Sequence, residues 1–436
     1  MKNQDTNIDK NSVAYSVLKG YVDFCFKRFY KVRYTNKESI NPNDTVIFAC
    51  NHQNALMDAL GLLSAFKWQP VFLARSDIFR QKTVARILRF LKLLPVYRIR
   101  DGYDKLANNN QIFEQTFSVL DNHNPIALFP EGNHVGQRRL RTLKKGIARI
   151  AFNYRHQNPG KKKDIKIIPT GLNYAHYHKP GSELLIRFNA PITLSDFDNS
   201  YALNPATAVN QFMSELDKKL KEIILHIKED SSTIEFISDL YAAALHREGE
   251  AAETVFQRQK QLILITENLK KQQPERFSEL ETEVKATREL LQAYHLCTND
   301  IALTKDLTSY RKPMEYIKLL ITFPAYIYAF LQNLIPWWVL NNLLIKLKDP
   351  HFKSSVFLVG TILIYPIIHA LQTLLFYLIS GSSILSVAYL ISLPISYIFK
   401  TWWDNKKGIL KTMGNLSAIA GPLQKHFTDI TRILNL

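Results

Sequence analysis

Residues 45–66 read TVIFACNHQNALMDALGLLSAF. Five of the first six are apolar, and most of the six are β-branched or aromatic, which is typical of a buried strand. After a polar turn, apolar residues recur at helical spacing, so the stretch predicts a strand that leads directly into a helix. Further strand-like runs, separated by helical patterns, are VFLA (71–74), PIALF (125–129), IKIIPTGLNY (165–174) and LLIRFN (184–189). Strands that alternate with helices predict a layered α/β domain over residues 33–202.

The composition limits the classes of protein that the chain can belong to. It has 436 residues, an apolar content of 46% and a formal net charge of +18. This length predicts two or three domains, and this apolar content excludes a disordered or collagen-like chain. Cys25, Cys50 and Cys297 lack metal-ligand spacing and favour a reducing compartment over a disulfide scaffold. The positive charge favours an acidic partner, namely nucleic acid, anionic lipid, or a phosphorylated or carrier-bound substrate.

Two helical regions flank the α/β domain. Residues 1–32 contain no secretory signal, and Val13–Val32 predict a basic, aromatic-rich amphipathic helix. This helix either lies in a membrane interface or packs on its own domain. Residues 203–312 lack strand patterning and are rich in Glu, Lys, Gln, Leu and Ala, which predicts an α-hairpin or small bundle. We expect this helical region to be a lid or a carrier-docking surface, with plain structural packing as the alternative.

Residues 313–436 predict a membrane-associated region. No Asp, Glu, Lys or Arg occurs within 319–345 or within 354–399, and one span needs about 20 apolar residues. The second run therefore predicts a transmembrane hairpin with its turn at Ser380–Ser383. The segments before, between and after the two runs are basic, and the positive-inside rule places all three on the cytoplasmic side. We therefore expect 319–345, which contains two prolines, to be re-entrant or interfacial, and a basic tail to follow the hairpin. Three full spans are the alternative.

The first candidate for chemistry is the pair His52 and Asp58. His52 follows the strand at 45–50, and Asp58 lies in the first turn of the predicted helix, for which Asn54 is a good N-cap. A neutral histidine accepts a proton near pH 7, and a carboxylate on its other nitrogen fixes the tautomer. The pair therefore fits a general base and its orienting partner. In the structural alternative, Asp58 only complements the helix dipole.

Three further blocks place polar residues beside predicted strands: PVYR at 95–98, FPEG at 129–132 and IIPTGL at 167–172. Arg98 carries a planar fork of donors that suits phosphate. Glu131 lies at the carboxyl end of a strand, where ligands bind in layered α/β folds, and Gly132 allows close backbone approach. Pro169 lies in the last block. Taken singly, each block also fits a surface turn or a solvated basic face.

In this order, NHQNALMD, PVYR, FPEG and IIPTGL resemble the motifs of the glycerolipid acyltransferase superfamily, the lysophosphatidate and glycerol-3-phosphate acyltransferase-like enzymes. The resemblance runs from near residue 43 to near residue 192. Five residues separate His52 from Asp58, whereas the usual pattern has four. This looks like the variant of fungal-type glycerol-3-phosphate/dihydroxyacetone-phosphate acyltransferases and their bacterial relatives. Asn133-His134 follow FPEG where Thr-Arg-Ser is commonest, which leaves the identity of the acceptor open.

The resemblance implies direct O-acyl transfer without a cofactor or metal. His52, oriented by Asp58, would remove the proton of an acceptor hydroxyl, which attacks the thioester of acyl-CoA or acyl carrier protein. The other residues would bind substrate: Glu131 and Gly132 the polyol of the acceptor, Arg98 its phosphate, and Pro169 the acyl-donor side. The acceptor would be glycerol-3-phosphate, dihydroxyacetone phosphate, a lysophosphatidate or a hydroxylated aminolipid. Membrane lipids are the remaining partner.

Other classes of protein fit the sequence less well. A zinc hydrolase would draw ligands from His52, His134, His176 and His178, but no HExxH-type framework accompanies them. A noncatalytic membrane scaffold explains the hydrophobic C-terminal region and the charge, but not four ordered blocks. Nucleic-acid binding fits the charge, yet no binding motif is present, so we expect no nucleic-acid partner. We expect an acyltransferase of phospholipid biosynthesis, anchored in a membrane with its catalytic domain on the cytoplasmic face.

Overall fold

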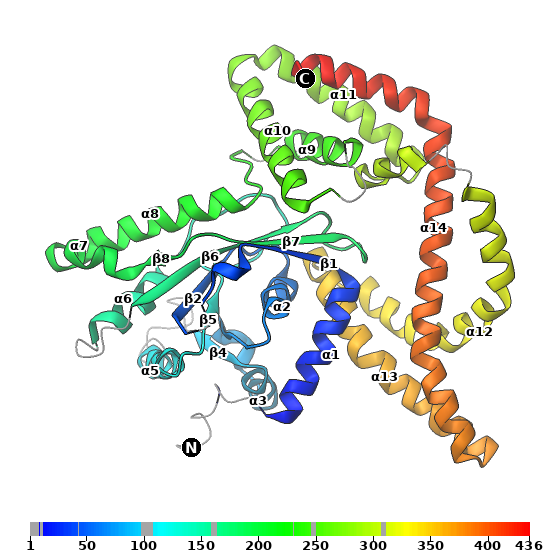
Figure 1. The fold of residues 1–436 in the computed structure, drawn as a ribbon, viewed down its shortest axis with the longest axis horizontal. Helices are drawn as coiled ribbons and strands as arrows, with labels where there is room; N and C mark the ends of the chain where they lie inside the picture. Colours follow the sequence, from blue (N-terminus) through cyan, green and yellow to red (C-terminus); the bar gives the residue numbers. More distant parts are fainter. Residues whose placement is uncertain are drawn as a thin grey trace. The chain divides into compact units, whose positions relative to one another are not determined.

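A computed structural model describes residues 8, 12–41, 43–96, 108–157, 164–229, 231–245, 250–306 and 311–436 (Figure 1). The chain forms two compact units. The first comprises Met1–His226 together with Asp349–Ser355, and the second comprises Ile227–Lys348 together with Val356–Leu436. A short segment from the apolar C-terminal region therefore belongs to the first unit.

The described part of the first unit contains one mixed sheet of eight strands. Their order is β1-β7-β6-β2-β5-β3-β4, and β8 also pairs with β6. Neighbouring strands are parallel, except that β7 and β8 run antiparallel to β6. The strands are β1 (Lys31–Thr35), β2 (Thr45–Cys50), β3 (Val71–Arg75), β4 (Leu93–Val96), β5 (Ile126–Leu128), β6 (Ile165–Tyr174), β7 (Glu183–Phe188) and β8 (Ile192–Thr193).

Helices cover both faces of this sheet, which confirms the layered α/β class. On one face, Ile47 of β2 packs in a core with Ile147 of α6 and Phe212 of α8. Its neighbour Phe48 points to the other face, where its ring lies 5.5 Å from that of Phe66 at the end of α2. The helices of this unit are α1 (Val13–Phe29), α2 (Ala55–Ala65), α3 (Lys82–Phe90), α5 (Asn108–Asp121), α6 (Gly146–Gln157), α7 (Asp198–Leu203) and α8 (Pro205–Ile223).

The predicted strands are present. Those at 45–50 and 165–174 have the predicted bounds, and the other three overlap their predicted ranges. All six residues of β2 are buried, because a strand in the middle of a parallel region is covered on both faces. The PVYR block overlaps β4, of which Pro95 and Val96 are the last two residues.

Two predicted boundaries need correction. Helix α1 ends at Phe29, and Lys31–Thr35 form β1, which pairs with β7. The first unit extends to His226 rather than to residue 202, because Phe212 of α8 is fully buried in its core. A helical pattern alone does not show which core a helix completes.

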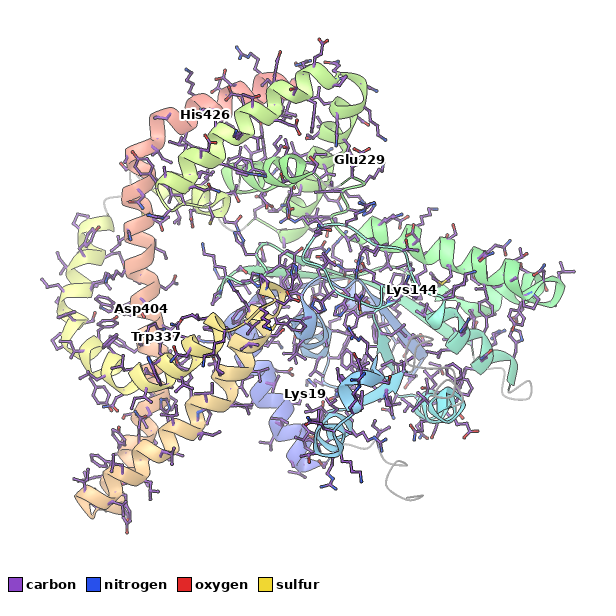
Figure 2. The ribbon with its side chains drawn as sticks, turned by 180° about the vertical axis from the view of Figure 1, so that it is seen from behind. Lys19, Lys144, Glu229, Trp337, Asp404 and His426 are labelled. Atoms are coloured by element: carbon purple, nitrogen blue, oxygen red, sulfur yellow. The ribbon has the colours of Figure 1, made fainter. Side chains whose placement is uncertain are left out.

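Helix α1 both packs on its domain and leaves a face exposed. Lys19, which Figure 2 labels on α1, donates hydrogen bonds to the carbonyl oxygens of Leu63 and Phe66 at 3.3 and 2.9 Å. These carbonyls lie at the end of α2, so they anchor α1 against it. Val17 and Phe24 on the same helix remain 68% and 57% exposed.

The described part of the second unit is helical and contains no strand, as predicted for its helical region. Its helices are α9 (Ser232–Ala244), α10 (Ala252–Gln272), α11 (Pro274–Ala293), α12 (Arg311–Ile345), α13 (Lys353–Ser380) and α14 (Ser383–Leu434). The first three residues of α13 belong to the first unit. Helix α14 runs through the predicted basic tail, and its end packs on the helical region. There His426 Nδ1 lies 2.9 Å from Glu283 Oε2 of α11.

Within the described ranges, three helices are long and apolar enough to cross a membrane: Pro313–Ile345, Pro350–Ser380 and Ser383–Leu434. The turn predicted at Ser380–Ser383 is present, with Gly381 at a φ of +64° between α13 and α14. Helix α12 is continuous despite its two internal prolines, so its length also suits a full span.

Gly171 of β6 has no room for a side chain. A Cβ at this position would lie 2.5 Å from the carbonyl oxygen of Ile223, at the end of α8. Because backbone would have to move, we expect Gly171→Ala to lower the free energy of unfolding by about 1–3 kcal/mol, as overpacking does. Thermal unfolding of the detergent-solubilised protein measures this as a lower Tm.

Gly146→Ala is the matched control, because a Cβ at the start of α6 meets no atom within 4 Å. Alanine also loses less conformational entropy on folding than glycine, so the Tm of this variant should be unchanged or higher. Equal Tm values for the two variants would contradict the packing of α8 on β6.

Candidate active site

The site forms where β2 leads into α2. His52 lies in the turn between them and Asp58 in the first turn of α2, as predicted. His52 Nδ1 lies 2.8 Å from Asp58 Oδ2. An ionised carboxylate only accepts hydrogen bonds, so Nδ1 carries the proton and Nε2 keeps its lone pair. The pair therefore has the tautomer that a general base needs.

Asp58 is fully buried and accepts hydrogen bonds from four groups. Besides the His52 ring, Oδ2 accepts from the backbone N–H groups of Gln53 and Asn54 at 2.7 and 2.8 Å. Oδ1 accepts from the hydroxyl of Tyr174, at the end of β6, at 2.8 Å. Burial and the nearby carboxylate raise the pKa of Tyr174 well above its usual value, so this hydroxyl remains a donor. Together the donors hold the carboxylate, and with it the imidazole, in one orientation.

The turn that contains the extra residue has an unusual backbone. Ala55 adopts a φ of +45°, in the left-handed region, which costs a residue other than glycine about 1–2 kcal/mol. Asn54 stands at the N-cap position, but its side chain makes no capping hydrogen bond, contrary to the prediction. Asp58 instead accepts from the backbone N–H of Asn54. The wider spacing between His52 and Asp58 thus leaves their contact intact.

Glu131 holds His52 by its backbone. Its Oε1 accepts from the N–H of His52 at 2.7 Å, and its Oε2 accepts from N and Nε of Arg141 at 3.1 and 3.2 Å. The residue is 5% exposed, and this burial raises the pKa of its carboxyl, although the hydrogen bonds oppose the shift. The sequence predicts Glu131 as a ligand of the acceptor. The structure adds a bracing role that the sequence did not indicate.

Two rings flank the imidazole of His52. Phe129 stacks on it with the ring centroids 4.2 Å apart, and His134 meets it edge-on at 5.3 Å. Burial and the adjacent His52 lower the pKa of His134, which favours the neutral form of its ring. A neutral neighbour does not oppose the positive charge that His52 acquires when it takes up a proton.

The remaining residues predicted for the site are Gly132, Pro169 and Arg98. Gly132 directly follows Glu131, is exposed, and has a φ of +75°, which favours glycine. Pro169 is buried in β6, where it pairs with Ala49 of β2. Arg98 lies outside the described residues. The structure thus brings His52, Asp58, Glu131 and Gly132 together and places Pro169 within the neighbouring strand.

Sequence reasoning missed two polar residues that support the site. Asn51 accepts from the backbone N–H of Leu172 at 2.7 Å and donates to its carbonyl oxygen at 3.1 Å, which ties the first block to the fourth. Tyr174 is the other. Asn51 could have been identified as a site residue, because it is a polar residue directly after a mostly apolar strand. No feature of the sequence pointed to Tyr174. Among the residues that the structure describes, no group of three or more His, Cys, Asp and Glu side chains could hold a metal ion.

Asp58→Asn tests the link between the carboxylate and the base. The amide keeps the shape, and the Tyr174 hydroxyl can accept a hydrogen bond from it, so the fold should persist. The imidazolium loses its negative partner, and we expect kcat for acyl transfer to fall by about 10²–10⁴. Steady-state kinetics measures the loss, and Tm reports on the fold.

Tyr174→Phe is the control, because it removes one hydrogen bond to Asp58 and keeps the charge. Its loss should be about tenfold or less, the value of one hydrogen bond. A wild-type kcat in Asp58→Asn would contradict the role of the pair.

Known proteins resemble this domain. The profile of the Acyltransferase family matches residues 31–173. Glycerol-3-phosphate O-acyltransferase 1 of Saccharomyces cerevisiae is 26% identical over 225 residues, which are 50% of this chain and 26% of the yeast protein. Glycerol-3-phosphate O-acyltransferase 2 of the same yeast is 24% identical over 141 residues, 32% of this chain and 18% of that protein. The matches thus span about a quarter or less of these relatives.

A solved structure also resembles this chain. It is the 1-acyl-sn-glycerophosphate (LPA) acyltransferase, PlsC, from Thermotoga maritima, with a TM-score of 0.32 and 19% identity, over 47% of this chain and 81% of that one. The family profile covers the strand, turn and helix that carry His52 and Asp58, as well as Glu131 and Gly132. Residues 31–173 thus form a domain similar to the Acyltransferase family, and the yeast relatives support a likeness to the glycerolipid acyltransferase superfamily.

Proposed function

We propose that the protein transfers a fatty acyl group from acyl-CoA or acyl carrier protein to a hydroxyl of a glycerol-phosphate-type acceptor, in phospholipid biosynthesis. The acceptor is glycerol-3-phosphate or a lysophosphatidate. The buried pair of His52 and Asp58, inside a domain of the acyltransferase family, carries this proposal. The names of the two yeast relatives support glycerol-3-phosphate. Another hydroxylated lipid, such as an aminolipid, is the alternative acceptor.

The geometry supports a direct transfer. Nε2 of His52 takes the proton of the acceptor hydroxyl as its oxygen attacks the carbonyl carbon of the thioester. The tetrahedral intermediate then loses the thiolate as the C–S bond breaks, and the imidazolium returns the proton to the sulfur. The products are an ester and a free thiol. Asp58 stabilises the imidazolium between the two proton transfers.

No cysteine is needed in this scheme. Cys50, two residues before His52, is fully buried, and burial raises the pKa of its thiol far above the usual value. A thiol in this state is a poor nucleophile, because the thiolate is the reactive form.

Substrate binding follows the family motifs. A carboxylate has about four lone-pair sites, so Glu131 can accept from an acceptor hydroxyl besides its three protein donors. Gly132 lies beside it and is exposed. In this proposal Arg98 binds the phosphate of the acceptor, and Pro169 shapes the acyl-donor side.

The catalytic domain carries a surface suited to a bilayer. Tyr15 of α1 and Phe90 of α3 are in edge contact at 5.9 Å, so the two helices adjoin. Exposed apolar residues on them include Val17 and Phe24 on α1 and Ile87 on α3, and both helices carry Lys and Arg. Apolar side chains among basic ones favour the interface of an anionic membrane.

The chain connections support the predicted topology. Asp349–Ser355 belongs to the catalytic unit, which supports a topology in which α12 ends and α13 begins on the side of this unit. We place the start of α12 on this side too in the proposed topology, in which the described helices between α1 and α12, none of them a candidate span, stay on one side. The undescribed gaps between these helices are shorter than the roughly 20 residues that a span needs. In the proposed topology α12 makes no net crossing, although its length would suit a span, and α13 and α14 form a hairpin whose end returns to α11.

Cysteine labelling tests this topology. We expect Lys348→Cys, between α12 and α13, and Lys82→Cys, on the catalytic domain, to react with a membrane-impermeant thiol reagent from the cytoplasmic face. Ser383→Cys, in the hairpin turn, should react from the opposite face. All three are made in a variant that lacks Cys25, Cys50 and Cys297. If Lys348→Cys reacts from the face opposite Lys82→Cys, α12 is a span and the proposed topology is wrong.

A competition assay tests the reaction. Purified protein in detergent receives one long-chain acyl-CoA with glycerol-3-phosphate and a lysophosphatidate together, and mass spectrometry identifies the products. We expect one acceptor to be acylated by the wild type, and His52→Ala to lose at least about 100-fold in rate because it lacks the general base.

His295→Ala, at an exposed histidine of the helical region, is the control and should retain activity. Absence of product from both acceptors, with acyl-CoA and with acyl carrier protein, would contradict the proposal. It would favour the aminolipid or scaffold alternatives.

A further inference from the structure

The segment Asp349–Ser355 lies in the first unit although it follows α12 in sequence. Asp349 Oδ1 accepts from the backbone N–H of His351 at 2.9 Å, which forms a short 3₁₀ turn, and α13 begins at Lys353. No sequence pattern connects this segment with the four motif blocks. In the folded protein, the segment contacts both the catalytic turn and the loop after FPEG.

One contact is a buried hydrogen bond to the catalytic turn. Ser354 Oγ donates to Asn54 Oδ1 at 2.7 Å, and both residues are 1% exposed. Asn54 Nδ2 donates to the Tyr30 hydroxyl and to the carbonyl oxygen of Tyr177, both at 3.1 Å. The amide of Asn54 thus uses its oxygen and its nitrogen, and Ser354 supplies the donor for the oxygen. A buried network that is satisfied in this way has one arrangement.

Asn54 connects this hydrogen bond to the base. Its backbone N–H donates to Asp58 Oδ2, the oxygen that also holds His52 Nδ1. The next residue, Ala55, has the left-handed φ of +45°. A strained backbone of this kind persists only where its surroundings fix it. The hydrogen bonds that hold the Asn54 side chain therefore lie directly beside this strained residue.

The segment also packs on the loop after FPEG. The Phe352 ring meets that of His134 edge-on at 4.8 Å. A Cβ on Gly136 would lie 2.8 Å from His351 Nδ1, so the segment and the loop are in close contact there. Because His134 is itself in edge contact with His52, the segment reaches both loops that surround the base.

We infer that Ser354 is a positioning residue for His52, acting through Asn54 and Asp58. Through its hydrogen bond to Asn54, Ser354 becomes a supporting part of the acyltransferase site. Without the Ser354 hydroxyl, the buried carbonyl of Asn54 loses its donor, and the turn that presents Asp58 and His52 is free to relax. The kinetic part of this inference rests on the proposed function.

Ser354→Ala and Ser355→Ala form a matched pair. Ser355 is also buried, at 5% exposed, but its Oγ has no hydrogen-bond partner among the described residues. We expect Ser354→Ala to lower kcat about 5- to 50-fold, with KM for donor and acceptor within twofold of the wild type. Ser355→Ala should keep the wild-type kcat, and Ser354→Thr, which retains a hydroxyl, should recover part of the loss. Equal kcat values for the two alanine variants would overturn the inference.

A double-mutant cycle tests the route through Asn54. If Ser354 acts through that side chain, Ser354→Ala combined with Asn54→Ala should be no slower than Asn54→Ala alone. Losses that multiply would show that Ser354 acts by another route and would overturn the assignment.

Hydrogen exchange separates this inference from the proposed function, because it needs no substrate. In the peptide that contains Gln53 and Asn54, whose amides bind Asp58, exchange should be faster in Ser354→Ala than in the wild type or in Ser355→Ala. A wild type that acylates nothing but shows this exchange pattern would refute the reaction and keep the positioning role. Unchanged exchange in Ser354→Ala would overturn that role even in an active enzyme.

Discussion

The buried carboxylate of Asp58 is the constraint to which the rest of the site conforms. A carboxylate removed from water costs several kcal/mol unless partners replace the lost solvent. Its partners come from the turn between β2 and α2 and from Tyr174 on β6. These donors reach it only if β2 and β6 lie side by side and the turn follows one path. The parallel pairing of β2 with β6 and the left-handed Ala55 meet both conditions.

Two buried carboxylates, those of Asp58 and Glu131, both hold His52 in place. Asp58 fixes the ring of His52 through Nδ1, and Glu131 fixes its backbone through the N–H. Each carboxylate is buried, so competition from water is weak. In the proposed reaction, a base held in this way needs little reorganisation at the moment of proton transfer, which is where a preorganised site lowers the barrier. In this proposal, the residues of the acyltransferase motifs both hold the turn in place and take part in the proton transfer.

The sequence predicted what depends on local pattern. Strand β2, helix α2 and the facing of His52 toward Asp58 follow from spacing within one short stretch. Strand β1 was missed because it is short, lies at the sheet edge and is partly exposed, so its pattern is weak. The partners Tyr174 and Ser354 could not be predicted, because they approach Asp58 and Asn54 only after distant segments pack. The capping role expected of Asn54 failed for the same reason: tertiary partners took its side chain.

The contact between Ser354 and Asn54 also bears on where the chemistry occurs. The candidate span Pro350–Ser380 starts with residues of the catalytic unit, so the proposed topology puts His52 near the level at which α13 would enter the bilayer. A lysophosphatidate keeps its chain in the hydrocarbon and its hydroxyl at the surface, whereas glycerol-3-phosphate and CoA are soluble in water. A base held at that boundary can meet all of them. In the proposed reaction, proton transfer needs only the α/β domain, so the apolar helices would place that reaction at the membrane, and Ser354 in the first turn of α13 would connect the two.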